Sequence, residues 1–169
     1  MDLGRWKLSL APALTAGALL WSAAIVAAPH AFRSPAWAPV AAIVYTGSAR
    51  ICHQRPERSF RAAGLQWPVC ARCAGLYLSG TMGALLGWIG VAGWRTAQAR
   101  WLLALAALPT AATWTLEFVG IMPFTNAARA IAALPLGLVA GWVFVRLLRY
   151  DSGLDAREID GRRTSPHHG

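Results

Sequence analysis

CAGLYLSGTMGALLGWIGVAG, residues 73–93, is the stretch that decides the fold class, because its 21 consecutive residues carry no charge. A helix needs about 20 apolar residues to cross the hydrocarbon core of a bilayer. Three further apolar runs accompany this one, and only Glu117 interrupts the third run of the chain. The sequence therefore predicts an all-α integral membrane protein, a bundle of four transmembrane helices with spans at about 8–28, 71–93, 101–121 and 128–148.

Composition excludes most other classes. Of 169 residues, 56% are apolar and only 14% are charged, whereas soluble domains average about 25% charged residues. This excludes an ordinary soluble enzyme, a disordered chain and a disulfide-stapled secreted miniprotein. The length suits a single membrane domain over 1–149, followed by a polar tail at 150–169 that we expect to be disordered.

Residues 36–49, AWAPVAAIVYTGSA, are apolar but too short to span. Fourteen helical residues cover about 21 Å, against a core of about 30 Å. We expect a short helix that lies at the membrane interface or dips into it. It leads into a polar loop at 50–70, between the first and second spans.

The basic residues give a weak orientation. Four spans place nine on the side of both termini (Arg5, Lys7, Arg95, Arg100, Arg146, Arg149, Arg157, Arg162, Arg163) and seven on the other (Arg33, Arg50, Arg55, Arg58, Arg61, Arg72, Arg129). Cytoplasmic segments carry the excess of Lys and Arg, so we expect a multi-pass protein of a bacterial inner membrane with cytoplasmic termini. The net charge of +9 is spread around the spans, which excludes nucleic acid as a partner.

Small residues recur every fourth position in the second span: Gly75, Ser79, Gly83 and Gly87. Gly137 and Gly141 repeat the spacing in the fourth span. Such a bare helix face lets a neighbouring backbone approach closely. The pattern predicts either tight packing within one chain or a homodimer through the Gly83/Gly87 or Gly137/Gly141 faces.

All three cysteines lie in the segment 50–75, RICHQRPERSFRAAGLQWPVCARCAG. Cys70 and Cys73 form a Cys-x-x-Cys at the expected N-terminus of the second span. There, the helix dipole, the free amides and Arg72 stabilise thiolates. Thiolates bind metals, and zinc accepts three of them with one imidazole in a tetrahedron. The pattern predicts a zinc site formed by Cys52, Cys70 and Cys73, with His53 or a water as the fourth ligand.

The same segment resembles a known family. The runs Cys52-His53-Gln54, Pro56-Glu57-Arg58-Ser59-Phe60 and 68–77 (PVCARCAGLY) are similar to the signature of the uncharacterised bacterial membrane proteins grouped as domain-of-unknown-function family 2085. The resemblance covers roughly 45–148, with Asn126, Arg129, Gly137 and Gly141 continuing it more loosely. Many members carry an Asp-Gly pair where this chain has Thr113-Trp114. The resemblance implies a multi-span membrane fold and no activity, since the family has none assigned.

Two alternatives to the metal site remain open. In a thiol–disulfide oxidoreductase, Cys70 and Cys73 would be the redox pair and Cys52 its relay, although an odd number of cysteines is incomplete for such a relay. In a purely structural role, the cysteines form a disulfide or stay as buried thiols beneath a loop that folds over the bundle. No catalytic residue stands out beyond these cysteines, so a non-enzymatic role is favoured.

Charged residues supply two further hypotheses. Arg55, Arg58 and Arg61 are three apart and would share a face if the stretch is helical, gripping an anion or lipid headgroups. Glu117 lies within an apolar span, where an acid is costly and pairs with a partner. Arg129 and Arg72, at the mouths of neighbouring spans, are the expected partners.

These features predict a metal-stabilised binding or assembly module in the lipid bilayer. A membrane thiol–disulfide oxidoreductase is the alternative. A small anion or lipid-headgroup transporter that acts as a dimer is the third hypothesis.

Overall fold

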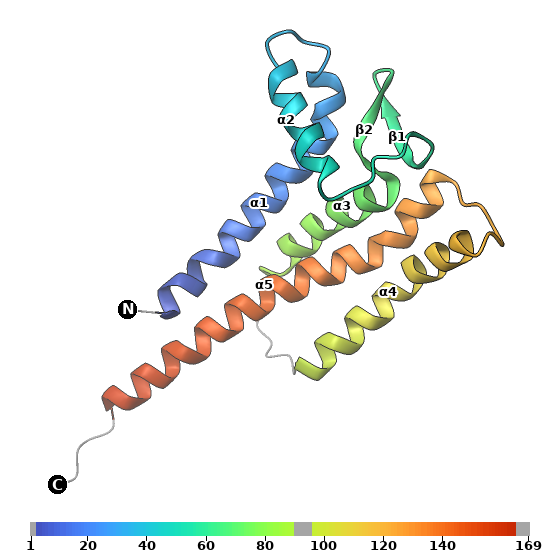
Figure 1. The fold of residues 1–169 in the computed structure, drawn as a ribbon. Helices are drawn as coiled ribbons and strands as arrows, with labels where there is room; N and C mark the ends of the chain where they lie inside the picture. The colour runs from blue at the N-terminus through green and yellow to red at the C-terminus, as the bar shows by residue number, and fades with distance from the viewer. Residues whose placement is uncertain (1–2, 90–95, 165–169) are drawn as a thin grey trace.

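We analysed a computed structural model that describes the backbone of residues 3–89 and 96–164, and the side chains of residues 10–89 and 98–149. Three long helices and a shorter one lie alongside one another, and a further short helix and a β-hairpin sit at one end (Figure 1). The elements in chain order are α1 (Leu3–Ala31), α2 (Ala38–Ala49), the 3-10 turn η1 (Pro56–Arg58), β1 (Ser59–Ala62), β2 (Leu65–Cys70), α3 (Ala71–Leu86), α4 (Thr96–Phe118) and α5 (Asn126–Thr164).

Three of these helices are long and apolar enough to cross a membrane: α1 over Leu10–Ala31, α4 over Gln98–Phe118 and α5 over Asn126–Arg149. They correspond to the predicted spans 8–28, 101–121 and 128–148. The predicted span 71–93 differs, because α3 has 16 residues and covers about 24 Å at 1.5 Å per residue. Helix α3 ends before Gly87, whose backbone amide donates a hydrogen bond to the Gly83 carbonyl. Residues 90–93 lie outside the described residues. The described chain thus has three candidate spans and a shorter fourth helix, so four spans are not confirmed.

The short helix α3 packs along α5 through glycine. A Cβ added at Gly83 would overlap the carbonyl oxygen of Leu138, and one at Gly141 would overlap that of Gly80. The two backbones are therefore in direct contact, as small-residue faces permit. Packing within one chain is confirmed. The α3–α5 contact occupies the Gly83 and Gly141 faces within the chain, and the homodimer expected through the Gly83/Gly87 or Gly137/Gly141 faces stays a prediction.

Hydroxyl groups join α1 to α3. Ser22 Oγ lies 2.7 Å from Thr81 Oγ1, Thr81 Oγ1 donates to the Ala18 carbonyl, and the Trp88 indole N–H donates to Thr15 Oγ1 at 3.0 Å. In an apolar medium such groups must find partners within the protein. These bonds fix α1 against α3, while α4 packs mainly on α5 and leaves most of its apolar side chains exposed.

Residues 38–70 form a cap over one end of the helices (Figure 1). The expected helix at 36–49 is present as α2, and its place at the membrane interface stays a prediction. The all-α prediction is incomplete, since β1 and β2 pair antiparallel and Ala62 faces Leu65. Ala63 (φ 54°) and Gly64 (φ 78°) make the two-residue turn, whose left-handed backbone matches the twist of a hairpin.

The expected disorder of the tail at 150–169 stays a prediction, and the structure describes its backbone to residue 164. The backbone of α5 continues from the span to Thr164. Extending a formed helix fixes one residue for each new hydrogen bond, so it costs far less than starting one. No proline interrupts the extension before Pro166, and residues 165–169 lie outside the described residues.

Candidate metal centre

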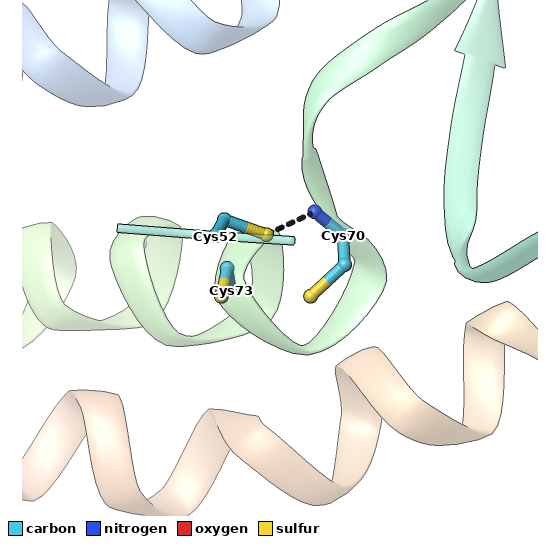
Figure 2. Close-up of side chains that lie close together, drawn as sticks. All are labelled: Cys52, Cys70 and Cys73. Atoms are coloured by element: carbon cyan, nitrogen blue, oxygen red, sulfur yellow. Dashed lines mark hydrogen bonds between the residues drawn. The ribbon is translucent and has the colours of Figure 1, made fainter. Parts of the chain in front are cut away.

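Three segments bring the cysteines together. Cys52 follows α2 and its amide bonds the Ser48 carbonyl. Cys70 ends β2 and caps the N-terminus of α3, and Cys73 lies in the first turn of that helix. Their sulfur atoms all lie within 4.8 Å of one another. Figure 2 shows the three side chains gathered at the start of α3, so residues 21 positions apart in the chain form one cluster.

Two glutamines hold the turn that positions Cys52. Gln54 has a left-handed backbone (φ 47°), and its side-chain amide donates to the carbonyls of Tyr45 and Pro68 at 2.8 and 2.7 Å. The amide of Gln66 donates back to the Gln54 carbonyl, and the Tyr45 hydroxyl donates to the Gln66 carbonyl. These bonds tie the end of α2 to β2. The sequence analysis missed both glutamines, although each lies next to a turn or a strand of the cysteine segment.

Hydrogen bonds favour a thiolate at Cys70, and the hydrogen bond with Cys70 raises the pKa of the Cys73 thiol. The backbone amide of Cys70 donates to Cys52 Sγ at 3.1 Å, the bond drawn in Figure 2. The Cys73 thiol lowers the pKa of Cys70 to about 5, against the opposing effect of burial. The Cys73 amide, the Cys52 thiol and the Arg72 amide lower this pKa further. Cys70 is therefore a thiolate at neutral pH, which is the metal-binding form.

The cluster has one closed side and one accessible side. Cys52 is 7% exposed and packs with Ile25, Val69 and Ala74, whereas Cys70 and Cys73 are half-buried. Apolar surroundings on the Cys52 side exclude water and strengthen the interaction between a cation and thiolates.

The residues present fit a zinc ion. Three sulfurs bound at about 2.3 Å in a tetrahedron are about 3.8 Å apart. The three sulfurs here lie within 4.8 Å of one another, so a contraction of at most about 1 Å would give that geometry. Within the described residues, no His, Asp or Glu joins the three cysteines. The side chain of His53, the expected fourth ligand, is exposed and outside the group.

The arginines of the cap do not form the expected helical face. Arg55 precedes η1, Arg58 ends it and Arg61 lies in β1. Pro56 starts a single 3-10 turn, and the backbone is extended from Ser59 onward. A spacing of three therefore does not align the side chains here. Arg55 and Arg61 are exposed, and Arg58 is half-buried.

Glu117 is paired with both arginines that the sequence analysis proposed. Arg72 Nη2 lies 2.7 Å from Glu117 Oε2, and Arg129 Nε and Nη2 each lie 2.7 Å from Oε1. Only 5% of the Glu117 side chain is exposed. The carboxylate thus joins the start of α3, the end of α4 and the first turn of α5.

The same junction holds the cap. Arg129 Nη1 donates to Asn126 Oδ1 at 2.7 Å, and the Asn126 side-chain amide donates to the Ser59 carbonyl at 3.0 Å. The Phe124 amide donates to Glu117 Oε1. The role of Asn126 was not predicted, although the residue belongs to the run that resembles the family.

Comparison with known proteins agrees with a membrane protein. The family described as "Predicted membrane protein (DUF2085)" matches residues 52–143, from the first cysteine into α5. An uncharacterised protein of Methanocaldococcus jannaschii is 31% identical over 110 residues, which cover 64% of this chain and 68% of that protein. An uncharacterised protein of Methanothermobacter thermautotrophicus is 33% identical over 88 residues, or 52% and 78% of the two chains. No solved structure matches the chain.

Proposed function

The chain belongs to the DUF2085 family of predicted membrane proteins, and from this premise we propose that it is a membrane-anchored binding or assembly module whose cap is held by a zinc ion. Cys52, Cys70 and Cys73 would be the ligands. The observation that carries the proposal is the convergence of all three cysteine sulfurs of the chain, Cys52 with the Cys70–Cys73 pair, to within 4.8 Å. Both relatives are archaeal, so a bacterial origin stays a prediction.

A metal bound by the three cysteines would link segments of the cap that bury little hydrophobic surface by themselves. Cys52 ends the segment that leads from α2, Cys70 ends the hairpin, and Cys73 belongs to α3. A two-stranded hairpin is marginally stable alone, and a structural zinc contributes folding free energy directly. Zinc would therefore fix the hairpin, with its exposed Arg61, relative to the membrane helices.

The experiment is metal analysis of protein purified anaerobically in detergent, with thiols counted before and after a reductant. We expect one zinc per chain, lost in Cys70→Ser and in Cys73→Ser and retained in His53→Ala. Because the chain has three cysteines in total, the thiol count reports this cluster alone. A preparation with three free thiols and no bound metal, even after zinc is added, would overturn the proposal.

The exposed arginines of the cap indicate that the module binds anionic ligands. Arg55 and Arg61 lie outside the buried junction, and guanidinium groups at a membrane surface bind phosphate. Lipids that remain with the purified protein should be enriched in anionic headgroups, and less so in Arg55→Gln/Arg61→Gln. Equal lipid composition in the two proteins would contradict this part. A small anion or lipid-headgroup transporter that acts as a dimer stays the third hypothesis, without a contact in the structure that favours it.

A membrane thiol–disulfide oxidoreductase is the second candidate, and the thiolate of Cys70 favours it. A thiolate beside two other sulfurs is the attacking group in disulfide exchange. The same experiment separates the two functions. A reducible Cys70–Cys73 disulfide in metal-free protein would favour the oxidoreductase over the zinc module.

A further inference from the structure

An apolar groove lies where α3 ends, against α4 and α5. Its volume is about 490 Å³, and its lining side chains are all aliphatic or aromatic: Leu86, Ile89, Leu102, Leu138, Val139 and Trp142. Ile89 is 68% exposed and Leu86 is 40% exposed, so the groove opens on the surface of the protein. Ligand pockets have volumes of about 300–1,000 Å³, and this groove therefore has room for one chain of a lipid.

The groove lies at the depth of the candidate spans. Three of its residues belong to the span of α5, and Leu102 belongs to that of α4. Leu138 and Arg149, the last residue of the α5 span, are eleven residues apart, which is about 16 Å along a helix. The hydrocarbon core is about 30 Å thick, so the groove lies within one leaflet. Figure 1 shows that α5 continues well past the end of α3 on this side.

Two arginines lie at the end of the groove that is nearer the membrane surface. The guanidinium carbon of Arg146 is 5.2 Å from the ring centre of Trp142, which lines the groove. That of Arg149 is 5.0 Å from the ring centre of Trp88, and its Nη1 donates to the carbonyls of Gly87 and Trp88 at 3.0 and 2.9 Å. Aromatic and basic side chains collect at the level of the lipid headgroups. The groove is thus apolar along its length and positively charged at one end.

We propose that this groove binds one anionic phospholipid, with an acyl chain against Val139 and the headgroup phosphate at Arg146 and Arg149. Basic pockets between membrane helices bind anionic headgroups, and guanidinium groups pair with phosphate. A helix of a partner protein in the same place would cover the two guanidinium groups and would need acids of its own to offset their burial. The site lies at the opposite end of α3 from the cysteines and does not depend on the proposed function.

Photocrosslinking of the full chain in phosphatidylcholine vesicles tests the inference. A trace of phosphatidylglycerol, or of phosphatidylcholine, carries a diazirine in one acyl chain, and mass spectrometry locates the labelled peptides. An arginine near an anionic headgroup gives a preference of about fivefold. We therefore expect the phosphatidylglycerol probe to label 86–89 and 138–142 at least about fivefold more than the phosphatidylcholine probe. Arg146→Gln should lower this preference about fivefold.

Val139→Trp fills the groove and leaves both arginines in place, so it should abolish the preferential labelling. Ile131→Trp is the matched control, because Ile131 lies on α5, is 64% exposed and does not line the groove. It should label as the unaltered protein does. Arg55→Gln/Arg61→Gln should also leave labelling at 86–89 and 138–142 unchanged, which separates this site from anionic lipid at the cap.

Equal labelling by the two probes would show ordinary contact with bulk lipid and would overturn the proposal. Preferential labelling that persists in Val139→Trp would overturn the groove as the site. No label at 138–142, the result expected if a protein helix covers the groove, would also overturn it. Arg146→Gln leaves the groove open and gives an independent test if Val139→Trp does not fold, since an unchanged preference in that variant would contradict the role of the arginines.

Discussion

Glu117 joins the start of α3, the end of α4 and the first turn of α5 through ion pairs. Its carboxylate accepts from Arg72 and from Arg129, and only 5% of its side chain is exposed. Removing one partner from a buried ionic group leaves uncompensated charge, at a cost of about 3–5 kcal/mol. Glu117→Ala should therefore lower the free energy of unfolding in detergent by about that amount, measured by chemical or thermal unfolding. Arg129→Ala should be similarly destabilising.

Glu57 offers the control for this prediction, because its side chain is exposed in η1. Exposed substitutions of this kind change stability by about 0.5 kcal/mol or less. If Glu117→Ala and Arg129→Ala were as mild as Glu57→Ala, the ion pairs would contribute nothing to folding. The idea of a stabilising junction would then have to be dropped.

Helix packing supplies the first prediction for whole elements. A Cβ at Gly83 would overlap the Leu138 carbonyl, so Gly83→Ala must push α3 and α5 apart. Overpacking of this kind costs about 1–3 kcal/mol, and the melting temperature in detergent should fall accordingly. Gly17→Ala in α1 is the matched control, because nothing lies within 4 Å of the added Cβ. That substitution should stabilise the helix slightly, and a similar loss in both variants would contradict the packing argument.

The elements also show what a single sequence can predict. Three spans, the short helix before the cysteines and the close α3–α5 contact follow from charge-free runs and small-residue spacing. The hairpin was missed because β1 has four residues and β2 has six, too few for an alternating pattern to stand out. The length of α3 was overestimated because apolar sequence continues past Gly87 while the helix does not.

The sequence likewise predicts some residues of the candidate site and misses others. The Cys-x-x-Cys and the buried acid with its arginines are visible in the sequence, because their residue types are rare in a membrane helix. His53 or a water was expected as the fourth ligand, and the exposed His53 lies outside the group of three cysteines. Asn126, Gln54 and Gln66 act through long-range bonds to backbone carbonyls, which leave no local pattern to read.

Removing the metal should loosen the cap and spare the helices. The sulfur cluster joins the segment after α2, the hairpin and α3, whereas α5 and α3 meet through their own backbones. Hydrogen exchange after treatment with a chelator should therefore rise in peptides from 50–70 and stay unchanged in 130–145. Uniform acceleration along the chain would show that metal loss unfolds the whole protein. No change in 50–70 would show that the cap does not depend on a metal.

The orientation of the whole molecule in the membrane decides which compartment the cysteines face. α1 begins, and α5 ends, away from the cap (Figure 1). The excess of basic residues on the side of the termini favours cytoplasmic ends, which would place the cap on the outer side. Neighbouring thiols in an oxidising compartment readily form disulfides. A bound metal would keep them as ligands there, so orientation and metal content are linked questions.

Lys7 is the single lysine of the chain, which makes the orientation measurable. Arg61→Lys adds a second lysine, on the exposed surface of β1, and retains the charge at this position. In vesicles with the cellular outer face exposed, a membrane-impermeant amine reagent should label position 61 and spare Lys7. Inverted vesicles should show the opposite pattern, and detergent should expose both lysines. Labelling of Lys7 alone in the first vesicles would place the cap in the cytoplasm, where reduced thiols need no metal to protect them.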